Sequence, residues 1–346
     1  MEQIITINDI KSAFSLEEIE SHLKTLRNLN LLVIGDVIID TYSFVVPKGR
    51  AIKDPILSTG FKFEEKYAGG VLAIGNHLSS YVNKVKILSL IGDRDSELEF
   101  IKKSLAGNVE LKEFIKENSP TNIKKRYIDH YRKNKLFKVE YMNDKPISEE
   151  LTKEIVDYLD SELINYDIVI VGDFGHGFIN TAIRDILEKK AKYLSINVQS
   201  NSANMGYNYI NHYKNPNFIV LNEAELRLPL MRRFEEIHDV IEEFYRVFKY
   251  EKFLVTVGKK GCILFNNKKL YTTEASKGKV IDTVGAGDAV FAITTLFTYL
   301  GADNQLVPFI SNCAGAIKSG YMGNKESVTK EKLLNFIRRL YENEVE

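Results

Sequence analysis

Continuous apolar runs recur along the chain, separated by stretches with helical periodicity. They lie at 31–34, 85–91, 167–171, 193–198, 218–221 and 253–257. Runs this short, without polar alternation, are typical of strands that are buried on both faces of a parallel sheet. Strands and helices that alternate in this way predict an α/β fold, with a mostly parallel sheet flanked by helices on both sides.

Residues 1–30 are predicted to form a helical extension that precedes this domain. Ser15 is a suitable N-cap for a helix. The apolar residues that share one face of this helix are Leu16, Ile19, Leu23 and Leu26. No later stretch has the composition of a linker, so residues 31–346 are expected to form one domain.

Two segments, 41–67 and 123–141, break the α/β alternation. Both contain short runs of aromatic and β-branched residues, interrupted in the first segment by Pro47, Gly49 and Pro55. Runs of this kind are typical of strands, so we expect a small β sheet beside the main domain.

The composition argues against several classes of function. The chain has 346 residues with 47 basic and 47 acidic side chains, and this balance argues against a nucleic-acid or anionic-membrane partner. There is no run of 18 apolar residues and no signal-peptide pattern. Cys262 and Cys313 give no disulfide framework, so a cytoplasmic location is expected. The six histidines lack metal-ligand spacing.

The stretch from Val280 to Phe291 carries the strongest sign of chemistry. Gly285, Ala286 and Gly287 open an apolar helix, where unpaired backbone N–H groups and the helix dipole favour an anion such as phosphate. Asp288 follows directly and is placed to take a proton from a hydroxyl beside that anion. The alternative is an ordinary glycine-rich turn with an acidic residue in the first helical turn.

Residues 282–288 read Asp-Thr-Val-Gly-Ala-Gly-Asp and resemble the C-terminal signature of the ribokinase-like (PfkB) family of carbohydrate kinases. The resemblance implies a ribokinase-like three-layer α/β fold, in which the segments 41–67 and 123–141 form a β lid over the sugar. It implies that Gly285, Ala286 and Gly287 form the anion hole and that Asp288 is the catalytic base. The cofactor would be ATP with Mg²⁺, and a monovalent cation is a further candidate.

Candidate sugar ligands follow the first strand. Asp36 and Asp40 come after the first apolar run, and ligands of doubly wound sheets gather at the carboxyl ends of strands. In the resembled family an aspartate after this strand binds sugar hydroxyls. Gly69 and Gly70 resemble the family's N-terminal Gly-Gly signature, although Ala73 stands where the family usually has asparagine.

Basic residues gather on the two lid segments, although the whole chain has no net charge. They are Lys48, Arg50, Lys53, Lys124, Lys125 and Arg126. Such residues either keep an exposed sheet edge soluble or clamp a phosphate that the substrate already carries. For a clamp, the candidates are Arg50, Lys125 and Arg126.

Candidate ATP ligands follow the later strands in the order of the family's motifs. Asn222 and Glu225 resemble its Asn-x-x-Glu element, in which Glu225 would hold Mg²⁺ through water; an acidic helix N-terminus is the alternative. Residues 256–261 resemble a Thr-x-Gly-x-x-Gly stretch beside the ribose and phosphates. The full set is Asn197, Asn222, Glu225, Thr256, Gly258, Gly261 and Asn312. The sequence Asn-Val-Gln at 197–199 departs from the family's usual Asp-Pro-Lys-like sequence.

Within the family, the chain most resembles D-glycero-D-manno-heptose 7-phosphate kinases. The likeness rests on residues 35–40, on 120–126, and on 172–177, where Asp173 is a further sugar-binding candidate. The expected reaction is ATP-dependent phosphorylation of this sugar phosphate to the 1,7-bisphosphate, in a homodimer built on the lid. A kinase of an unphosphorylated sugar or nucleoside, and a catalytically silent sugar- or nucleotide-binding protein, stay open.

Overall fold

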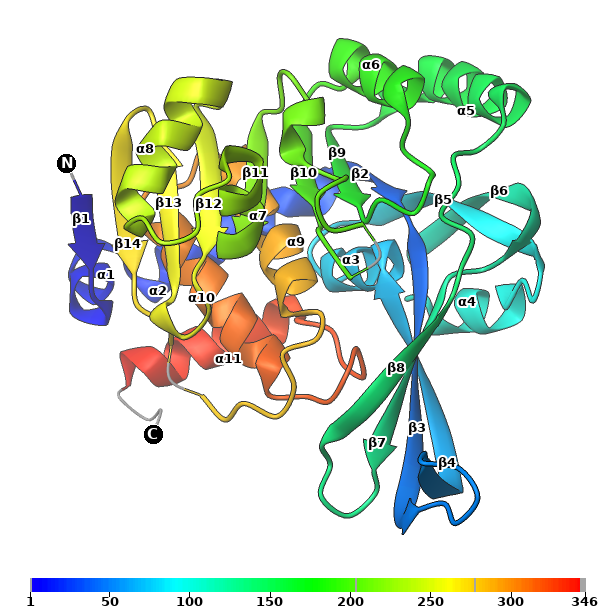
Figure 1. Cartoon of the computed structure of the whole chain (residues 1–346). Helices are drawn as coiled ribbons and strands as arrows, with labels where there is room; N and C mark the ends of the chain where they lie inside the picture. Colours follow the sequence, from blue (N-terminus) through cyan, green and yellow to red (C-terminus); the bar gives the residue numbers. More distant parts are fainter. Residues whose placement is uncertain (1, 203, 277, 343–346) are drawn as a thin grey trace.

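Two β sheets and the helices around them make up the computed structural model, which describes residues 2–202, 204–276 and 278–342 (Figure 1). The strands are β1 (Glu2–Ile5), β2 (Asn30–Gly35), β3 (Val37–Arg50), β4 (Leu57–Gly70), β5 (Lys84–Arg94), β6 (Val109–Pro120), β7 (Ile123–Asp129), β8 (Lys135–Tyr141), β9 (Ile168–Asp173), β10 (Leu194–Val198), β11 (Phe218–Asn222), β12 (Lys252–Thr256), β13 (Cys262–Asn266) and β14 (Lys269–Thr273). The α-helices are α1 (Ile7–Ala13), α2 (Leu16–Thr25), α3 (Val71–Leu78), α4 (Leu98–Ser104), α5 (Glu149–Glu162), α6 (Thr181–Lys190), α7 (Glu223–Arg227), α8 (Ile237–Phe248), α9 (Ala286–Tyr299), α10 (Leu306–Ser319) and α11 (Lys330–Tyr341).

The large sheet has the order β1-β14-β13-β12-β11-β10-β9-β2-β5-β6. Its strands pair in parallel except β13, which runs antiparallel to both of its neighbours. Alternate residues of each central strand enter different cores: Leu31 and Val33 pack with α3, α9 and α10, whereas Leu32 and Ile34 pack with α5, α6 and α8. This arrangement is why the strands are apolar at every position, and it confirms the predicted parallel α/β sheet.

The small sheet has the order β4-β3-β7-β8 and extends away from the main domain as a lid (Figure 1). Strand β3 pairs antiparallel with β4 and parallel with β7, and β7 pairs antiparallel with β8. Only Asp36 separates β2 from β3, and β4 runs directly into α3. The base of the lid therefore lies at the carboxyl edge of the large sheet.

Both edge strands of the large sheet differ from the sequence-based expectation. Residues 1–30 include β1, which pairs in parallel with β14, so this segment contributes to the sheet as well as two helices. At the opposite edge, β6 pairs in parallel with β5 in a segment for which the sequence predicted no strand. Among the described residues, no helix is long and apolar enough to cross a bilayer.

Candidate active site

Asp36 and Asp173 lie side by side at the carboxyl ends of the paired strands β2 and β9. The Oδ2 atom of Asp36 accepts hydrogen bonds from the backbone N–H groups of Phe174 (3.2 Å) and His176 (3.4 Å). Asp173 accepts from the Tyr213 hydroxyl at 2.9 Å. Burial, followed by repulsion from Asp173, raises the pKa of Asp36 to about 7. Burial also raises the pKa of Asp173.

Asp40 lies on β3 and forms an ion pair with Arg126 on β7. Two glycines make room for this side of the site. A Cβ on Gly69 would lie 2.5 Å from Oδ2 of Asp40, and one on Gly70, whose φ is +56°, would lie 2.4 Å from the Asp36 carbonyl oxygen. Larger residues would displace both aspartates, which explains why the chain needs glycine at these two positions.

The basic residues of β7 divide between the two faces of the lid. In the register of β3 with β7, Asp40 pairs with Lys124 and Tyr42 pairs with Arg126. Side chains alternate along a strand, so Lys124 and Arg126 share the face that carries Asp40. Lys125 lies on the opposite face, where it forms an ion pair with Glu64 at 2.6 Å. The sequence named both lysines among the basic residues of the lid but chose Lys125, which faces away, as a candidate ligand. The period of two along a strand could have identified Lys124 instead.

Arg50 lies apart from these residues. It is exposed at the end of β3, where it pairs with Leu57. Ten residues of strand separate it from Asp40, which is roughly 30 Å at the usual rise per residue. Within one chain, Arg50 is therefore not brought to the site.

The glycine turn places Asp288 at the start of α9. Gly285 has a φ of +79°, and a Cβ there would lie 2.2 Å from Oδ1 of Asn324. Asp288 is buried, and its Oδ1 accepts a hydrogen bond from Nε2 of Gln199 at 2.8 Å. Burial raises the pKa of Asp288 to about 7, although the Gln199 hydrogen bond opposes the shift. A carboxylate with this pKa can serve as a general base near neutral pH.

Gln199 links the carboxyl end of β10 to Asp288. Its Nε2 also donates to Oδ1 of Asn197 at 3.0 Å, and Asn197 Nδ2 in turn donates to the Val220 carbonyl at 2.8 Å. The departure from the family's Asp-Pro-Lys-like sequence therefore bears directly on the candidate base. The sequence showed this departure but did not indicate that Gln199 would form a hydrogen bond with Asp288.

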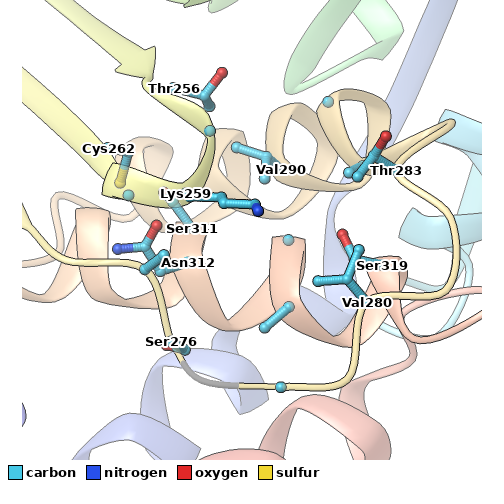
Figure 2. A pocket seen from close by; sticks show the side chains of 18 residues that line it. Thr256, Lys259, Cys262, Ser276, Val280, Thr283, Val290, Ser311, Asn312 and Ser319 are labelled. Carbon is cyan, nitrogen blue, oxygen red and sulfur yellow. The ribbon is translucent and has the colours of Figure 1, made fainter.

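A cavity of about 500 Å³ opens beside the glycine turn (Figure 2). It extends from Ala286 and Gly287 to Asn312 on α10, a size that suits a nucleotide. Four of the predicted ATP ligands line it: Thr256, Gly258, Gly261 and Asn312. Nδ2 of Asn312 donates to the carbonyls of Thr273 and Glu274, both at 2.9 Å, and so holds the loop after β14. Lys259, which was not predicted, points into the cavity (Figure 2).

Asn197, Asn222 and Glu225 lie outside the lining of this cavity. Asn222 and Glu225 form a capping box at the start of α7, in which Glu225 Oε2 accepts from the Asn222 N–H at 2.9 Å. Its Oε1 accepts from the Ser200 N–H at 3.3 Å. Burial raises the pKa of Glu225 to about 7, and the charge of Asp288 adds to the shift. One buried carboxylate near a phosphate site fits Mg²⁺ held partly through water.

No cluster of three acidic, histidine or cysteine residues that could hold a metal by itself occurs in the described part of the chain. Any Mg²⁺ would then depend on ligands that ATP supplies, together with Glu225 and water. The donors present fit that arrangement, because Mg²⁺ binds few protein carboxylates when phosphate oxygens are available.

A known protein family matches most of the chain. Residues 28–301 match the pfkB family of carbohydrate kinases. The bifunctional protein HldE of Campylobacter jejuni subsp. doylei is 24% identical over 321 residues, which cover 91% of this chain and 66% of that protein. The chain therefore spans slightly less than two thirds of that relative.

Among solved structures, phosphofructokinase-2 of Escherichia coli in complex with potassium has a TM-score of 0.70 at 13% identity, covering 91% of this chain and 99% of that one. Ribokinase of Arabidopsis thaliana, complexed with ribose and ATP, has a TM-score of 0.67 at 16% identity, covering 90% and 99%. These likenesses confirm the ribokinase-like fold. The chain belongs to the pfkB family of carbohydrate kinases, whose members are ATP-dependent sugar kinases.

Proposed function

We propose that this chain transfers the γ-phosphate of ATP to a hydroxyl of D-glycero-D-manno-heptose 7-phosphate, giving the 1,7-bisphosphate. The observation that carries the proposal is the position of Asp288. It lies at the N-terminus of α9, between the cavity that suits a nucleotide and the aspartates at the base of the lid. The likeness to HldE supports the heptose substrate.

In this mechanism the sugar phosphate lies against Asp36, Asp40 and Asp173, whose carboxylates accept hydrogen bonds from its hydroxyls. Asp288 takes the proton of the attacking hydroxyl. Backbone N–H groups at Gly285–Gly287 stabilise the charge that develops on the transferred group. Bound Mg²⁺, held through water by Glu225, would neutralise charge on the ATP phosphates.

The phosphate already on the substrate needs a positively charged partner. A basic residue that already forms an ion pair is a weaker candidate for this role than one that does not. Arg126 is engaged by Asp40, and Lys125 by Glu64 on the opposite face. Lys124 is buried on the face of β7 that carries Asp40, and it forms no ion pair among the described residues. We therefore propose that Lys124 contacts this phosphate, while Arg126 stays paired with Asp40.

A kinase of an unphosphorylated sugar is the second candidate, and the Asp40–Arg126 ion pair favours it, since a neutralised guanidinium needs no phosphate partner. A silent binding protein is disfavoured by the intact glycine turn and Asp288.

Steady-state kinetics with the heptose and its 7-phosphate would separate these functions, with Asp288→Asn as the inactive control. The proposal expects the enzyme to phosphorylate the 7-phosphate, with a kcat/KM at least 100-fold above its kcat/KM for the free heptose. Equal values would instead favour a free-sugar kinase. ADP release no faster than in the control, with every sugar and nucleoside tested, would indicate a binding protein.

Three finer properties accompany the proposal. A homodimer built on the lid is supported by the apolar side chains exposed on its first hairpin. A cytoplasmic location is supported by two cysteines that are free and buried, Cys262 and Cys313. A monovalent cation is the third property: the potassium in the phosphofructokinase-2 structure speaks for it, and the buried ammonium of Lys318 beside the proposed anion hole speaks against it.

A further inference from the structure

Lys318, on α10, is completely buried, with an exposed fraction of 0%. Lysine is almost never fully buried unless its charge is compensated. Its Nζ donates hydrogen bonds to the backbone carbonyls of Val284, at 2.8 Å, and Gly323, at 2.7 Å. Burial lowers the pKa of this ammonium, and three carboxylates, those of Asp282, Asp288 and Asp40, oppose the shift.

The two carbonyls belong to the two loops that frame the phosphate end of the site. Val284 directly precedes Gly285, the first residue of the anion hole. Gly323 precedes Asn324, whose Nδ2 lies 3.5 Å from Oδ2 of Asp40. The side chain of Lys318 also runs directly beneath the turn, because a Cβ on Gly285 would lie 3.2 Å from its Cε. The lysine therefore ties the anion-hole loop to the loop that follows α10.

Carboxylates surround the ammonium group of Lys318. Asp40, Asp282 and Asp288 all interact with it electrostatically. Asp40 and Asp282 are also paired with Arg126 and Lys135, so Asp288 is the one of the three without an ion-pair partner among the described residues. Its carboxylate would repel the γ-phosphate of ATP at the neighbouring anion hole unless a positive charge offset it. Backbone N–H groups carry only partial charges, whereas Lys318 supplies a full one at a fixed position.

We propose that Lys318 is a positioning residue for phosphoryl transfer: a built-in cation that fixes the anion-hole loop and offsets the charge of the surrounding carboxylates. The inference rests on the proposed kinase function. Lys318 acts through the loop and does not itself contact the substrate. A lysine that only stabilised the fold would affect unfolding without selecting between ATP and ADP, whereas a cation behind the γ-phosphate site must favour ATP.

The test compares Lys318→Met, which keeps most of the length of the side chain without its charge, with Lys318→Ala. Lys252→Met is the matched control, because burial lowers the pKa of Lys252 as it does for Lys318, but Lys252 is only partly buried and lies at the first residue of β12, the opposite end of that strand from the site. Loss of Lys318 should lower kcat about 100-fold, as removal of an oxyanion-hole donor does. Calorimetry should find ATP binding about tenfold weaker and ADP binding within threefold of wild type.

Propylammonium replaces the atoms that Lys318→Ala removes, so adding it should raise the kcat of this variant at least tenfold. Tetramethylammonium, which has no N–H donor, should not raise it. A kcat within threefold of wild type in Lys318→Met, equal weakening of ATP and ADP, or absence of rescue would overturn the proposal. If neither variant folds, wild-type enzyme decides: turnover should change less than threefold when potassium is replaced by sodium or choline at constant ionic strength. A larger change would mean that the loop needs a cation from solution and would reject a built-in one.

These results are separable from failure of the kinase proposal. A wild-type enzyme that phosphorylates no sugar would refute the function but would leave the ATP and ADP affinities of the variants as a direct test of Lys318.

Discussion

At the residue scale, three carboxylates at the carboxyl edge of the sheet share one electrostatic environment. Burial raises the pKa of Asp36, Glu225 and Asp288 to about 7 in each case. Their roles differ because their hydrogen bonds differ. Asp36 and Glu225 accept from backbone N–H groups. Within the part of the chain that the structure describes, Asp288 accepts only the side-chain amide of Gln199, and it lies at the proposed anion hole. Asp288 is thus the carboxylate best placed to exchange a proton with substrate.

Replacement of Asp288 by asparagine should abolish turnover and leave ATP affinity nearly unchanged. The substitution preserves shape but removes the basic carboxylate, and loss of a general base typically costs about 10²–10⁴-fold in rate. Rapid-quench measurement of the chemical step, together with calorimetric titration of ATP, checks both parts. A variant that retains more than about a tenth of the wild-type rate in the chemical step would show that another group is the base.

The same pKa predicts how the activity depends on pH. Asp288 must be ionised to act as a base, so kcat/KM should fall about tenfold per pH unit below about 7 and level off above it. Asp36 titrates in the same range and could cause an identical limb. Profiles of Asp36→Asn settle the assignment: the acidic limb should persist in this variant if Asp288 causes it, and its disappearance would assign the limb to Asp36.

Burial of Asp288 also predicts a stability cost at high pH. Its folded pKa of about 7 lies above the usual value near 3.9. Its contribution to stability is therefore fully present below about pH 4 and is lost as pH rises through about 7. Asp288→Asn should raise the free energy of unfolding by a few kcal/mol at pH 8 and by clearly less at pH 5, as measured by urea denaturation. An equal gain at both pH values would show that the effect is not due to ionisation.

At the element scale, the sequence predicted the central strands well and the edge strands poorly. A central parallel strand is buried on both faces, and so it appears as an apolar run such as 31–34 or 168–171. An edge strand needs no such run, because only one neighbour pairs with it. Strand β6 has many exposed and polar residues, and β1 has only four residues, so neither produces a pattern that stands out.

The sequence could name candidate site residues where chain order and chemistry coincide, as at Asp36, Gly285–Gly287 and Asp288, and the structure brings these residues to the carboxyl edge of the large sheet. The sequence could not do so where contacts join distant segments. Gln199 and Asp288 are 89 residues apart, and Asn324 and Asp40 are 284 apart. Arg50 shows a second reason, since a basic residue on a lid segment can lie at the far end of a long strand.

The lid is attached to the anion-hole segment through Asp282. Its carboxylate accepts hydrogen bonds from the hydroxyl of Tyr42 on β3 and from Nζ of Lys135 on β8, both at 2.7 Å. It also accepts the backbone N–H of Val284 at 3.2 Å, directly before the anion hole. The position of the lid is thus coupled to the loop that is proposed to bind the transferred phosphate.

Tyr42→Phe should loosen this attachment and raise the KM for the sugar substrate about tenfold, while the Kd for ADP changes less than twofold. The loss of one hydrogen bond to a buried carboxylate is expected to cost about 1–3 kcal/mol. Tyr67→Phe is the matched control, because Tyr67 packs in the same cluster but its hydroxyl bonds to Glu65 within the lid. Similar kinetics for both variants would argue against a role for the Asp282 contact.

At the scale of the whole molecule, the lid carries more exposed apolar surface than a solvated sheet needs. The side chains concerned all lie on the hairpin formed by β3 and β4, and they are Ile52, Ile56, Leu57, Phe61 and Phe63. The chain has no net charge to keep copies apart. Strand β4 is also an edge strand of its sheet, with hydrogen-bonding groups on its outer side open to a partner.

These features lead to the prediction that the chain is a homodimer in which the lids pair, and that Phe61→Ser makes it monomeric at micromolar concentration. Phe61 is 66% exposed, so its replacement should scarcely disturb the fold of one chain, whereas an aromatic side chain at the centre of an interface often contributes 2 kcal/mol or more. Phe234→Ser is the control, since Phe234 is 85% exposed but precedes α8, outside the lid. Sedimentation velocity should find a dimer for wild type and Phe234→Ser and a monomer for Phe61→Ser. If the wild type is a monomer at 10 μM and above, the predicted dimer is wrong. If Phe61→Ser is still a dimer, the interface lies elsewhere.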